Sequence, residues 1–483
     1  MTGAAVPDET PPVPGGEPVR LDAYTGDEPV TGRLAGDHRP WALEAPAVGA
    51  DQQLVPTPPR PEDWWDRRVG WGVVLPERPG LDAAALARAD DAGEPIAALV
   101  AARPGARVLR YRPGGSLSDW TLRDYAAGTE PLAPTAAIGT DAGQLPAYLL
   151  LVGSPAEIPW HVQYLLNPVR AVGRLDLDPD GLANYVAALL SDWAGAGCRY
   201  AAPVTWAVDA GGGDITTLMR EAVAAPLADR FRADSDMPDG VYLDGSVAPA
   251  TGTALVAALA ANQPALVVTS SHGMTGPLTD PDLMRAQLGL PVDQAHTVVR
   301  PEALLAGWQP DGAVWFAQAC CSAGTEAPSL YSGLFESGGL VASVLDGVAG
   351  VGAGTAPLPR ALLGAAKPLR AFVGHVEPTF DWTMRFPPNR QRLTASLQLA
   401  LYDRLCTGLP VGLALAPHYT PVGSLLFGHS RAVQRFNRAP FGPAGAAATS
   451  GALDLAVYSK VTAYDRLSTV ILGDPTVTVP LPR

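Results

Sequence analysis

Short apolar runs bounded by glycine or proline, separated by longer alanine-rich segments, constrain the fold of this 483-residue chain more than any other feature. The runs are continuous rather than alternating, which is typical of strands in a parallel sheet that is covered on both faces. The alanine-rich segments carry apolar residues at helical spacing. This alternation favours an α/β fold with a mostly parallel sheet flanked by helices on both faces. The predicted strands are Trp71–Leu75, Val108–Tyr111, Tyr148–Val152, Thr205–Val208, Leu266–Thr269, Val314–Ala317 and Leu340–Leu345. The predicted helices include Leu81–Arg88, Asp180–Trp193 and Ile215–Phe231.

Composition divides the chain into three regions. Residues 1–62 are dense in Pro, Gly, Asp and Glu and lack apolar periodicity, so we expect a leader that is disordered or extended. Residues 63–200 are expected to form an N-terminal α/β subdomain. Residues 201–483 are expected to form a second α/β subdomain, which carries the two candidate residues considered below.

Charge and cysteine content narrow the classes of function. The net charge of −14 opposes binding to nucleic acid or to anionic membranes. The N-terminus lacks the basic start and apolar core of a signal peptide, and no apolar run is long enough to span a membrane, so we expect a cytoplasmic protein. The four cysteines include an adjacent pair, show no zinc spacing and predict free thiols rather than disulfides. We expect no metal and no cofactor.

Two chemically reactive residues follow predicted strands. Ligand sites of open α/β sheets lie beyond the carboxyl ends of the strands. The strand Leu266–Thr269 is followed by SSHG, with His272, and the strand Val314–Ala317 is followed by QACC, with Cys320 and Cys321. The sequence therefore predicts a thiol and an imidazole at the same edge of the sheet.

A thiol and an imidazole together suit nucleophilic catalysis. The thiolate is the nucleophile, so a nearby base and backbone N–H donors for an oxyanion are required. We expect the N–H groups of Gly273 and Cys320 to be those donors. The small residues 322–325 could open a helix or tight turn, and a helix N-terminus there would lower the pKa of the thiol. A buried cysteine is more often inert packing, and His-Gly is often a simple turn. Their occurrence after successive strands, about 48 residues apart, favours the functional interpretation.

These motifs resemble a known group of peptidases. SSHGM after one apolar strand and FAQACCSAG after another are similar to the clan of cysteine peptidases that includes caspases, legumain, separase, gingipains and CHAT-domain proteases. That resemblance implies Cys320 as nucleophile, because the cysteine directly after Ala is the one those families use. Cys321 is then a packed or redox-buffering neighbour.

A second resemblance covers residues of about 145–480. YLLLVGSPAEIP, AVGRLDLD and the C-terminal VILGDPT are similar to segments of gingipain-like peptidases. The resemblance implies that Asp178, where gingipains have Glu, orients the catalytic histidine. The alternative is that Asp178 caps the helix that begins at Pro179. The stretch after it is apolar where gingipains carry an acidic residue, so a preference for basic residues is not supported.

Three further residues are candidates for binding the substrate: Gln318, His375 and Glu377. Gln318 lies two positions before Cys320, and the other two belong to the segment AFVGHVEPTFDW. For His375 the alternative is a satisfied core histidine.

Together these features predict a cysteine endopeptidase that cleaves a protein or peptide substrate through an acyl-enzyme, with His272 and Cys320 as its catalytic pair. A regulatory protein partner, or self-processing, could control it. Two other classes stay open: a catalytically silent scaffold or interaction protein of the same fold, and a metabolic α/β enzyme that uses the thiol for other acyl-transfer chemistry.

Overall fold

A computed structural model describes residues 19–24, 29–32, 58–114, 120–438 and 443–482. The chain divides into two compact units, Met1–Pro58 and Pro59–Arg483. In the first unit, β1 (Val19–Tyr24) and β2 (Pro29–Gly32) pair as an antiparallel hairpin. Apart from this hairpin and residues 58–62, the predicted leader lies outside the described residues.

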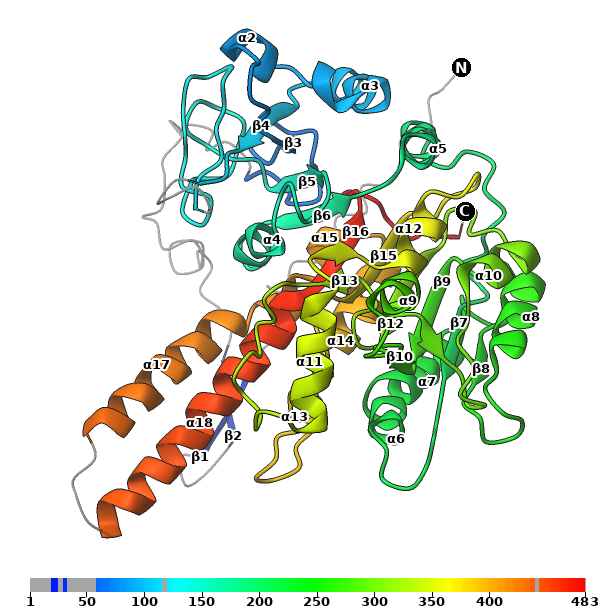
Figure 1. Cartoon of the computed structure of the whole chain (residues 1–483), viewed down its shortest axis with the longest axis vertical. Coiled ribbons are helices and arrows are strands. Elements are labelled where there is room, and N and C mark those ends of the chain that lie inside the picture. The colour runs from blue at the N-terminus through cyan, green and yellow to red at the C-terminus, as the bar shows by residue number, and fades with distance from the viewer. Residues whose placement is uncertain (1–18, 25–28, 33–57, 115–119, 439–442, 483) are drawn as a thin grey trace. The chain divides into compact units, whose positions relative to one another are not determined.

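A ten-stranded sheet forms the centre of the larger unit (Figure 1), with the order β4-β3-β5-β6-β16-β15-β12-β9-β7-β8. Its strands are β3 (Trp71–Pro76), β4 (Arg107–Tyr111), β5 (Tyr148–Val152), β6 (Ala171–Leu175), β7 (Val204–Ala207), β8 (Val241–Leu243), β9 (Leu266–Ser270), β12 (Val314–Gln318), β15 (Ala371–His375) and β16 (Thr469–Gly473).

One antiparallel contact reverses the direction of half of this sheet. Neighbouring strands are parallel everywhere except between β15 and β16. Since β16 is parallel to β6, the strands β3, β4, β5 and β6 run opposite to β7, β8, β9, β12 and β15. The sheet therefore has two carboxyl edges on opposite sides, and only one of them can hold residues that follow β9 and β12.

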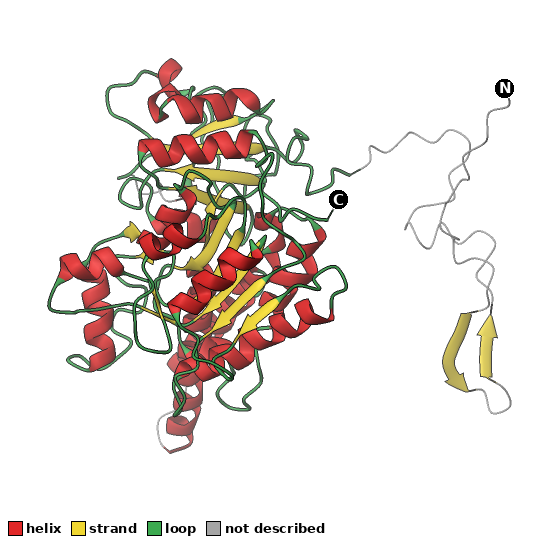
Figure 2. Ribbon diagram, turned by 90° about the vertical axis from the view of Figure 1, so that its right-hand side faces the viewer, coloured by secondary structure: helices red, strands yellow, loops and turns green. Residues whose placement is uncertain are grey.

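Helices connect the strands and cover the sheet (Figure 2). The α-helices are α2 (Ala83–Leu86), α3 (Glu94–Ala102), α4 (Trp160–Leu166), α5 (Pro179–Leu190), α6 (Ile215–Met219), α7 (Ala225–Ala233), α8 (Gly252–Asn262), α9 (Pro281–Gln287), α10 (Pro301–Gly307), α11 (Leu340–Gly350), α12 (Pro357–Leu363), α13 (Asp381–Met384), α14 (Ala395–Gln398), α15 (Val411–Ala414), α16 (Ala416–Tyr419), α17 (Val422–Arg438) and α18 (Pro443–Ser468). Short 3-10 and π segments continue several of them. Among the described residues, we find no helix whose length and apolar character would let it cross a bilayer.

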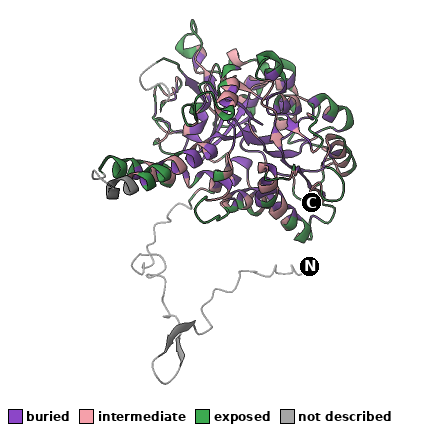
Figure 3. Ribbon diagram, turned by 60° about the horizontal axis from the view of Figure 1, so that its bottom comes forward, coloured by how far each residue is buried: buried purple, intermediate pink, exposed green. Residues whose placement is uncertain are grey.

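Burial follows directly from the apolar runs in the sequence. Every residue of β9, β12, β15 and β16 is buried, and Figure 3 shows these strands as the buried centre of the larger unit. A strand with no exposed residue must be covered on both faces of the sheet. The continuous apolar sequences of these strands are typical of that position. The α/β fold with a mostly parallel sheet is thus confirmed.

Three details differ from the sequence-based expectation. Leu340–Leu345 belongs to helix α11 rather than to a strand, because a short apolar run fits either element. AFVGH, which is not among the predicted strands, is the strand β15. The predicted division at residue 200 does not separate two compact units, since β16 pairs with both β6 and β15 and makes the sheet continuous.

Candidate active site

Cys320 lies on a sharp turn at the carboxyl end of β12. The next residue, Cys321, has a φ of 55°, a left-handed conformation that is uncommon outside glycine and concentrates at functional sites. The Ser322 hydroxyl fixes the turn, because it donates to Ala317 O (3.3 Å) and accepts from the His375 N–H (3.0 Å). The turn separates the two neighbouring thiols.

The two thiols differ in exposure. Cys321 is fully buried among Met284, Leu288 and Val348, and burial raises the pKa of its thiol well above the usual value. Cys320 keeps part of its surface exposed, and its Sγ accepts a hydrogen bond from the Thr379 N–H at 3.4 Å. Burial also raises the pKa of Cys320, although the Thr379 bond acts in the opposite direction. Of the pair, Cys320 is the residue that keeps some exposed surface.

The chain after Cys320 forms a tight turn rather than a helix. Ala323 N–H donates to His375 O at 2.8 Å, and Gly324–Thr325 then forms the short strand β13, paired with β14 (Gly354–Thr355). The predicted helix N-terminus at residues 322–325 is absent, and with it the expected lowering of the thiol pKa. The pKa shift has the opposite sign because burial dominates.

His272 reaches the same edge of the sheet from the neighbouring strand. Ser270 of β9 is in register with Gln318 of β12, and the Ser271 N–H donates to Gln318 O at 3.2 Å. The chain then forms β10 (His272–Gly273), which pairs with β11 (Pro291–Val292). A Cβ atom on Gly273 would overlap the carbonyl oxygen of Cys320. The absence of a side chain at residue 273 therefore lets the backbones beside the imidazole and the thiol touch.

Asp214 is the carboxylate partner of His272. It follows β7, the next strand of the sheet, and its Oδ2 lies 3.0 Å from His272 Nε2. Its Oδ1 accepts from Thr216 N–H (2.8 Å) and Thr216 Oγ1 (2.6 Å), which makes Asp214 the N-cap of α6. Burial acts to raise the pKa of the Asp214 carboxyl, but the Thr216 bonds and His272 outweigh it and lower the pKa. The contact orients the ring and fixes which nitrogen faces away from it.

Asp178, the residue expected in this role, lies elsewhere. Its Oδ1 accepts from the Gly181 N–H at 2.8 Å and caps α5. Asp178 follows β6, which is separated from β9 by three strands and runs in the opposite direction. It therefore lies at the opposite edge of the sheet, and the helix-cap interpretation of Asp178 is the one that holds.

The two predicted oxyanion donors are oriented consistently with that role. Met274 N–H donates to Leu290 O across the antiparallel contact with β11. Alternate residues of such a strand direct their N–H groups to opposite sides, so the Gly273 N–H points away from β11. The Cys320 N–H donates to no backbone carbonyl in the part of the chain that the structure describes.

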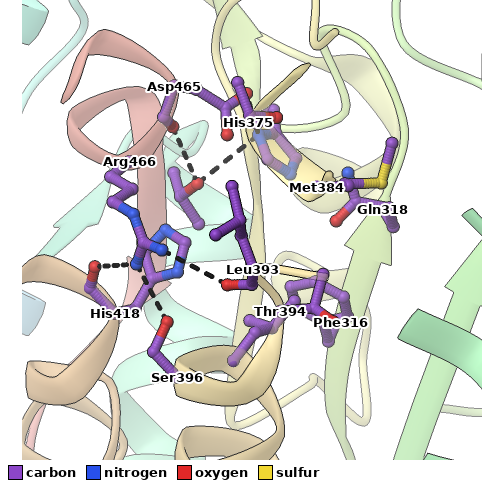
Figure 4. Close-up of a pocket in the computed structure, with 13 residues that line it drawn as sticks. Phe316, Gln318, His375, Met384, Leu393, Thr394, Ser396, His418, Asp465 and Arg466 are labelled. Atoms are coloured by element: carbon purple, nitrogen blue, oxygen red, sulfur yellow. Dashed lines mark hydrogen bonds and ion pairs between the residues drawn. The ribbon is translucent and has the colours of Figure 1, made fainter. Parts of the chain in front are cut away.

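Gln318 and His375 line a small internal cavity rather than an open cleft (Figure 4). Its volume is about 30 Å³, and most of the residues around it are buried. Burial lowers the pKa of His375 to about 4 and raises the pKa of Asp465, whose Oδ1 is 4.0 Å from His375 Nδ1, to about 7. Within the described residues, His375 Nε2 and Asp465 Oδ1 have no hydrogen-bond partner.

Glu377 supports the loops around the nucleophile. Its carboxylate is buried and accepts from Ser329 Oγ at 2.9 Å and from Leu330 N–H at 2.7 Å. Its carbonyl oxygen accepts from Cys321 N–H at 3.3 Å. Burial raises the pKa of Glu377 to about 7. These contacts make Glu377 a positioning group in this structure, with no side-chain oxygen directed at open solvent.

No protein-family model matches the chain, and no curated protein matches it. The chemistry must therefore be argued from the geometry alone. Residues that follow three adjacent strands carry a thiol, an imidazole and a carboxylate at the same edge of the sheet. Contacts join the carboxylate to the imidazole, and the backbone of Gly273 to that of Cys320. Across the described ranges no group of His, Cys, Asp or Glu side chains is arranged to hold a metal ion. An imidazole held by a carboxylate can accept a proton and return it.

Proposed function

We propose that this protein is a cysteine endopeptidase of the caspase–gingipain type, with Cys320 as nucleophile and His272 as general acid and base. The observation that carries the proposal is the 3.0 Å contact between His272 Nε2 and Asp214 Oδ2, in a chain segment whose next residue, Gly273, packs against the backbone of Cys320. A histidine that only fills space does not need a carboxylate partner at the carboxyl edge of the sheet. A carboxylate–imidazole–thiol series is the arrangement that activates a nucleophile.

The first half of the reaction forms an acyl-enzyme. Because the raised pKa keeps the thiol of Cys320 protonated at rest, proton transfer must accompany attack. Asp214 occupies Nε2 of His272, so Nδ1 takes the thiol proton while Sγ bonds to the substrate carbonyl carbon. The Gly273 and Cys320 N–H groups stabilise the resulting oxyanion. His272 then gives the proton to the amide nitrogen, the C–N bond breaks and an amine leaves.

The second half releases the acid. A water molecule loses a proton to His272 and attacks the thioester carbon. The C–S bond breaks, the proton returns to Cys320 and a carboxylic acid leaves. Both steps use the same oxyanion donors. The substrate class that follows is a protein or peptide, and control by a regulatory partner or by self-processing is part of the proposal.

The proposed setting is the cytoplasm. All four cysteines are free among the described residues, and a reducing compartment would keep a reactive thiol available. The net charge of −14 disfavours nucleic acid and anionic lipid as partners.

A mixed peptide library tests the proposal together with an acyloxymethylketone probe that alkylates active thiols. Wild type and Cys321→Ala should cleave and become labelled, whereas Cys320→Ala and His272→Ala should lose cleavage by at least about a thousandfold. Labelling should also require Cys320, with Cys198→Ala as the control for the other partly exposed thiol. Equal cleavage by Cys320→Ala and wild type would refute the assignment. A folded protein that neither cleaves nor labels at any pH from 6 to about 9 would favour the silent scaffold.

A further inference from the structure

A wide apolar groove opens on the larger unit beside α18. Its volume is about 1150 Å³, and its walls come from the loop before α11, from the segment around α13 and from α18. Five aromatic side chains line it: Phe335, Phe380, Trp382, Phe386 and Tyr458. Such a volume exceeds what one small ligand needs, so the groove could hold several side chains of an extended chain.

Exposed apolar residues mark the groove as a binding surface rather than as core. Trp382 is 43% exposed, Leu453 51% and Leu455 38%. Aromatic pairs connect the walls of the groove. The ring centroids of Phe386 and Tyr458 are 4.8 Å apart, and those of Phe380 and Phe335 are 5.6 Å apart. A preformed apolar surface of this kind gains free energy when it is covered.

One hydrogen bond relates the groove wall to the proposed nucleophile. Thr379 N–H donates to Cys320 Sγ at 3.4 Å, and the next residue, Phe380, lines the groove. Thr379 itself is buried, and neither Cys320 nor His272 lines the groove. A chain bound covalently at Cys320 would therefore reach the groove with side chains that lie beyond Thr379, and this proximity relates the groove to the proposed reaction.

The strand order decides which part of the substrate would enter. β12, which ends near Cys320, lies between β9 and β15. His272 follows β9 and must face the leaving amine, because it protonates that nitrogen. Thr379 follows β15, on the other flank of the thiol. The acyl portion of the substrate, which precedes the cleaved bond, therefore extends towards Thr379 and the groove.

We propose that this groove binds bulky apolar side chains, such as Leu, Phe or Trp, on the acyl side of the cleaved bond. The inference rests on the proposed function. The carboxylates of Asp381 and Asp454 also line the groove, so acidic side chains would be repelled there. The preferred peptide thus has apolar residues before the cut and no Asp or Glu among them.

Two measurements separate this inference from the proposed function. The first is the cleavage preference of wild type in a library that varies the four residues before the cut. The expected result is a gain of at least about tenfold in kcat/KM for a bulky apolar residue over Ala at one or more of these positions. Trp382→Ala and Leu453→Ala should remove that gain mainly through KM, with cleavage of the Ala-containing peptide unchanged. Phe427→Ala, on the exposed surface of α17 (69% exposed) and outside the groove, should behave as wild type.

The second measurement is binding of an uncleaved apolar peptide to Cys320→Ala, followed by quenching of tryptophan fluorescence. Leu453→Ala in the same background, which keeps Trp382 as reporter, should abolish the response, and Phe427→Ala should keep it. Cleavage without apolar preference, or with a preference unaffected by both groove variants, overturns the inference and leaves the peptidase intact. Groove-dependent binding by a protein that cannot cleave refutes the peptidase and retains the groove as a peptide-binding site.

Discussion

The two carboxyl edges of the sheet are built from opposite kinds of polar contact. At the edge formed by β3, β4, β5 and β6, a buried charge is fully paired: the Arg110 guanidinium bonds both Asp91 oxygens at 2.9 and 2.7 Å and also donates to Leu86 O. At the edge formed by β7, β9, β12 and β15, the imidazole of His272 and the carboxylate of Asp214 pair while both stay partly exposed. The same rule about strand ends points to both edges.

The difference teaches that the position at a strand end is not sufficient to define a site. Arg110 has its donors satisfied and leaves nothing to offer a substrate, which is the pattern of a structural ion pair. His272 keeps 41% of its side chain exposed, and Asp214 keeps 32%. Polar groups that are held in place yet remain accessible are the ones that can do chemistry. The predictions below test whether the two edges really divide structure from function in this way.

The largest expected effect comes from a pair of matched aspartates, one at each edge. Asp214 and Asp178 both cap a helix through Oδ1, but only Asp214 contacts an imidazole. Asparagine preserves a helix cap, so Asp214→Asn and Asp178→Asn should both fold. Asp214→Asn replaces an acceptor with a donor at His272 Nε2, and we expect kcat/KM to fall by about 10²–10⁴-fold. Steady-state kinetics on the best library peptide measures this.

Asp178→Asn is the control for that experiment and should cleave at the wild-type rate. A comparable loss in Asp178→Asn would show that the edge formed by β6 takes part in catalysis. The division between the two edges would then be broken.

The next effect is on stability, at the opposite edge. Arg110→Ala leaves Asp91 and several carbonyl oxygens without their buried partner, so the free energy of unfolding should fall by about 3–5 kcal/mol. Arg67, 74% exposed and 3.4 Å from Asp141, is the surface control. Arg67→Ala should cost no more than about 1 kcal/mol. Urea denaturation measures both, and equal losses would contradict the distinction between buried and surface pairs.

The sequence predicted the buried strands better than it predicted the candidate site around them. The predicted runs WGVVL, YLLLV, LVVT and VWFA all lie in buried strands, since their continuous apolar character fits no exposed element. The reversal of half the sheet could not be seen, because it depends on Thr469–Gly473 pairing with strands that are distant in the sequence. The reversal puts Asp178, which the resemblance to gingipains implied, at the edge opposite to His272.

Asp214 was missed although its signal was present. It follows the predicted strand Thr205–Val208 and stands directly before a predicted helix, in the sequence GGGD. The rule that selected His272 and Cys320 applies equally to this position. The inward orientation of Gln318 and His375, in contrast, depends on packing against α18, which no local pattern encodes.

The smallest effect concerns the buried cavity behind the reactive edge. The pKa of Asp465 is about 7 in the folded protein, against an ordinary value of 3.8. Between these pH values the folded state holds a proton that the unfolded chain releases, so this group makes the protein less stable as pH rises from about 4 to about 7. Asp465→Asn cannot titrate. The stability of Asp465→Asn relative to wild type, measured as the free energy of unfolding, should therefore increase by about 3 kcal/mol as the pH rises over this range.

Urea denaturation at pH 5 and pH 8 checks this, with Asp454→Asn on the exposed surface of the same helix as the control. His375, 4.0 Å from Asp465, acts in the opposite direction: its lowered pKa makes the folded protein less stable as pH falls through about 6.5 to 4. Comparing each variant with wild type at the same pH cancels the His375 contribution. If Asp465→Asn and Asp454→Asn show the same pH dependence, Asp465 is ionised in the folded protein. Asp465 would then be a buried charge inside the protein, as Arg110 is at the opposite edge.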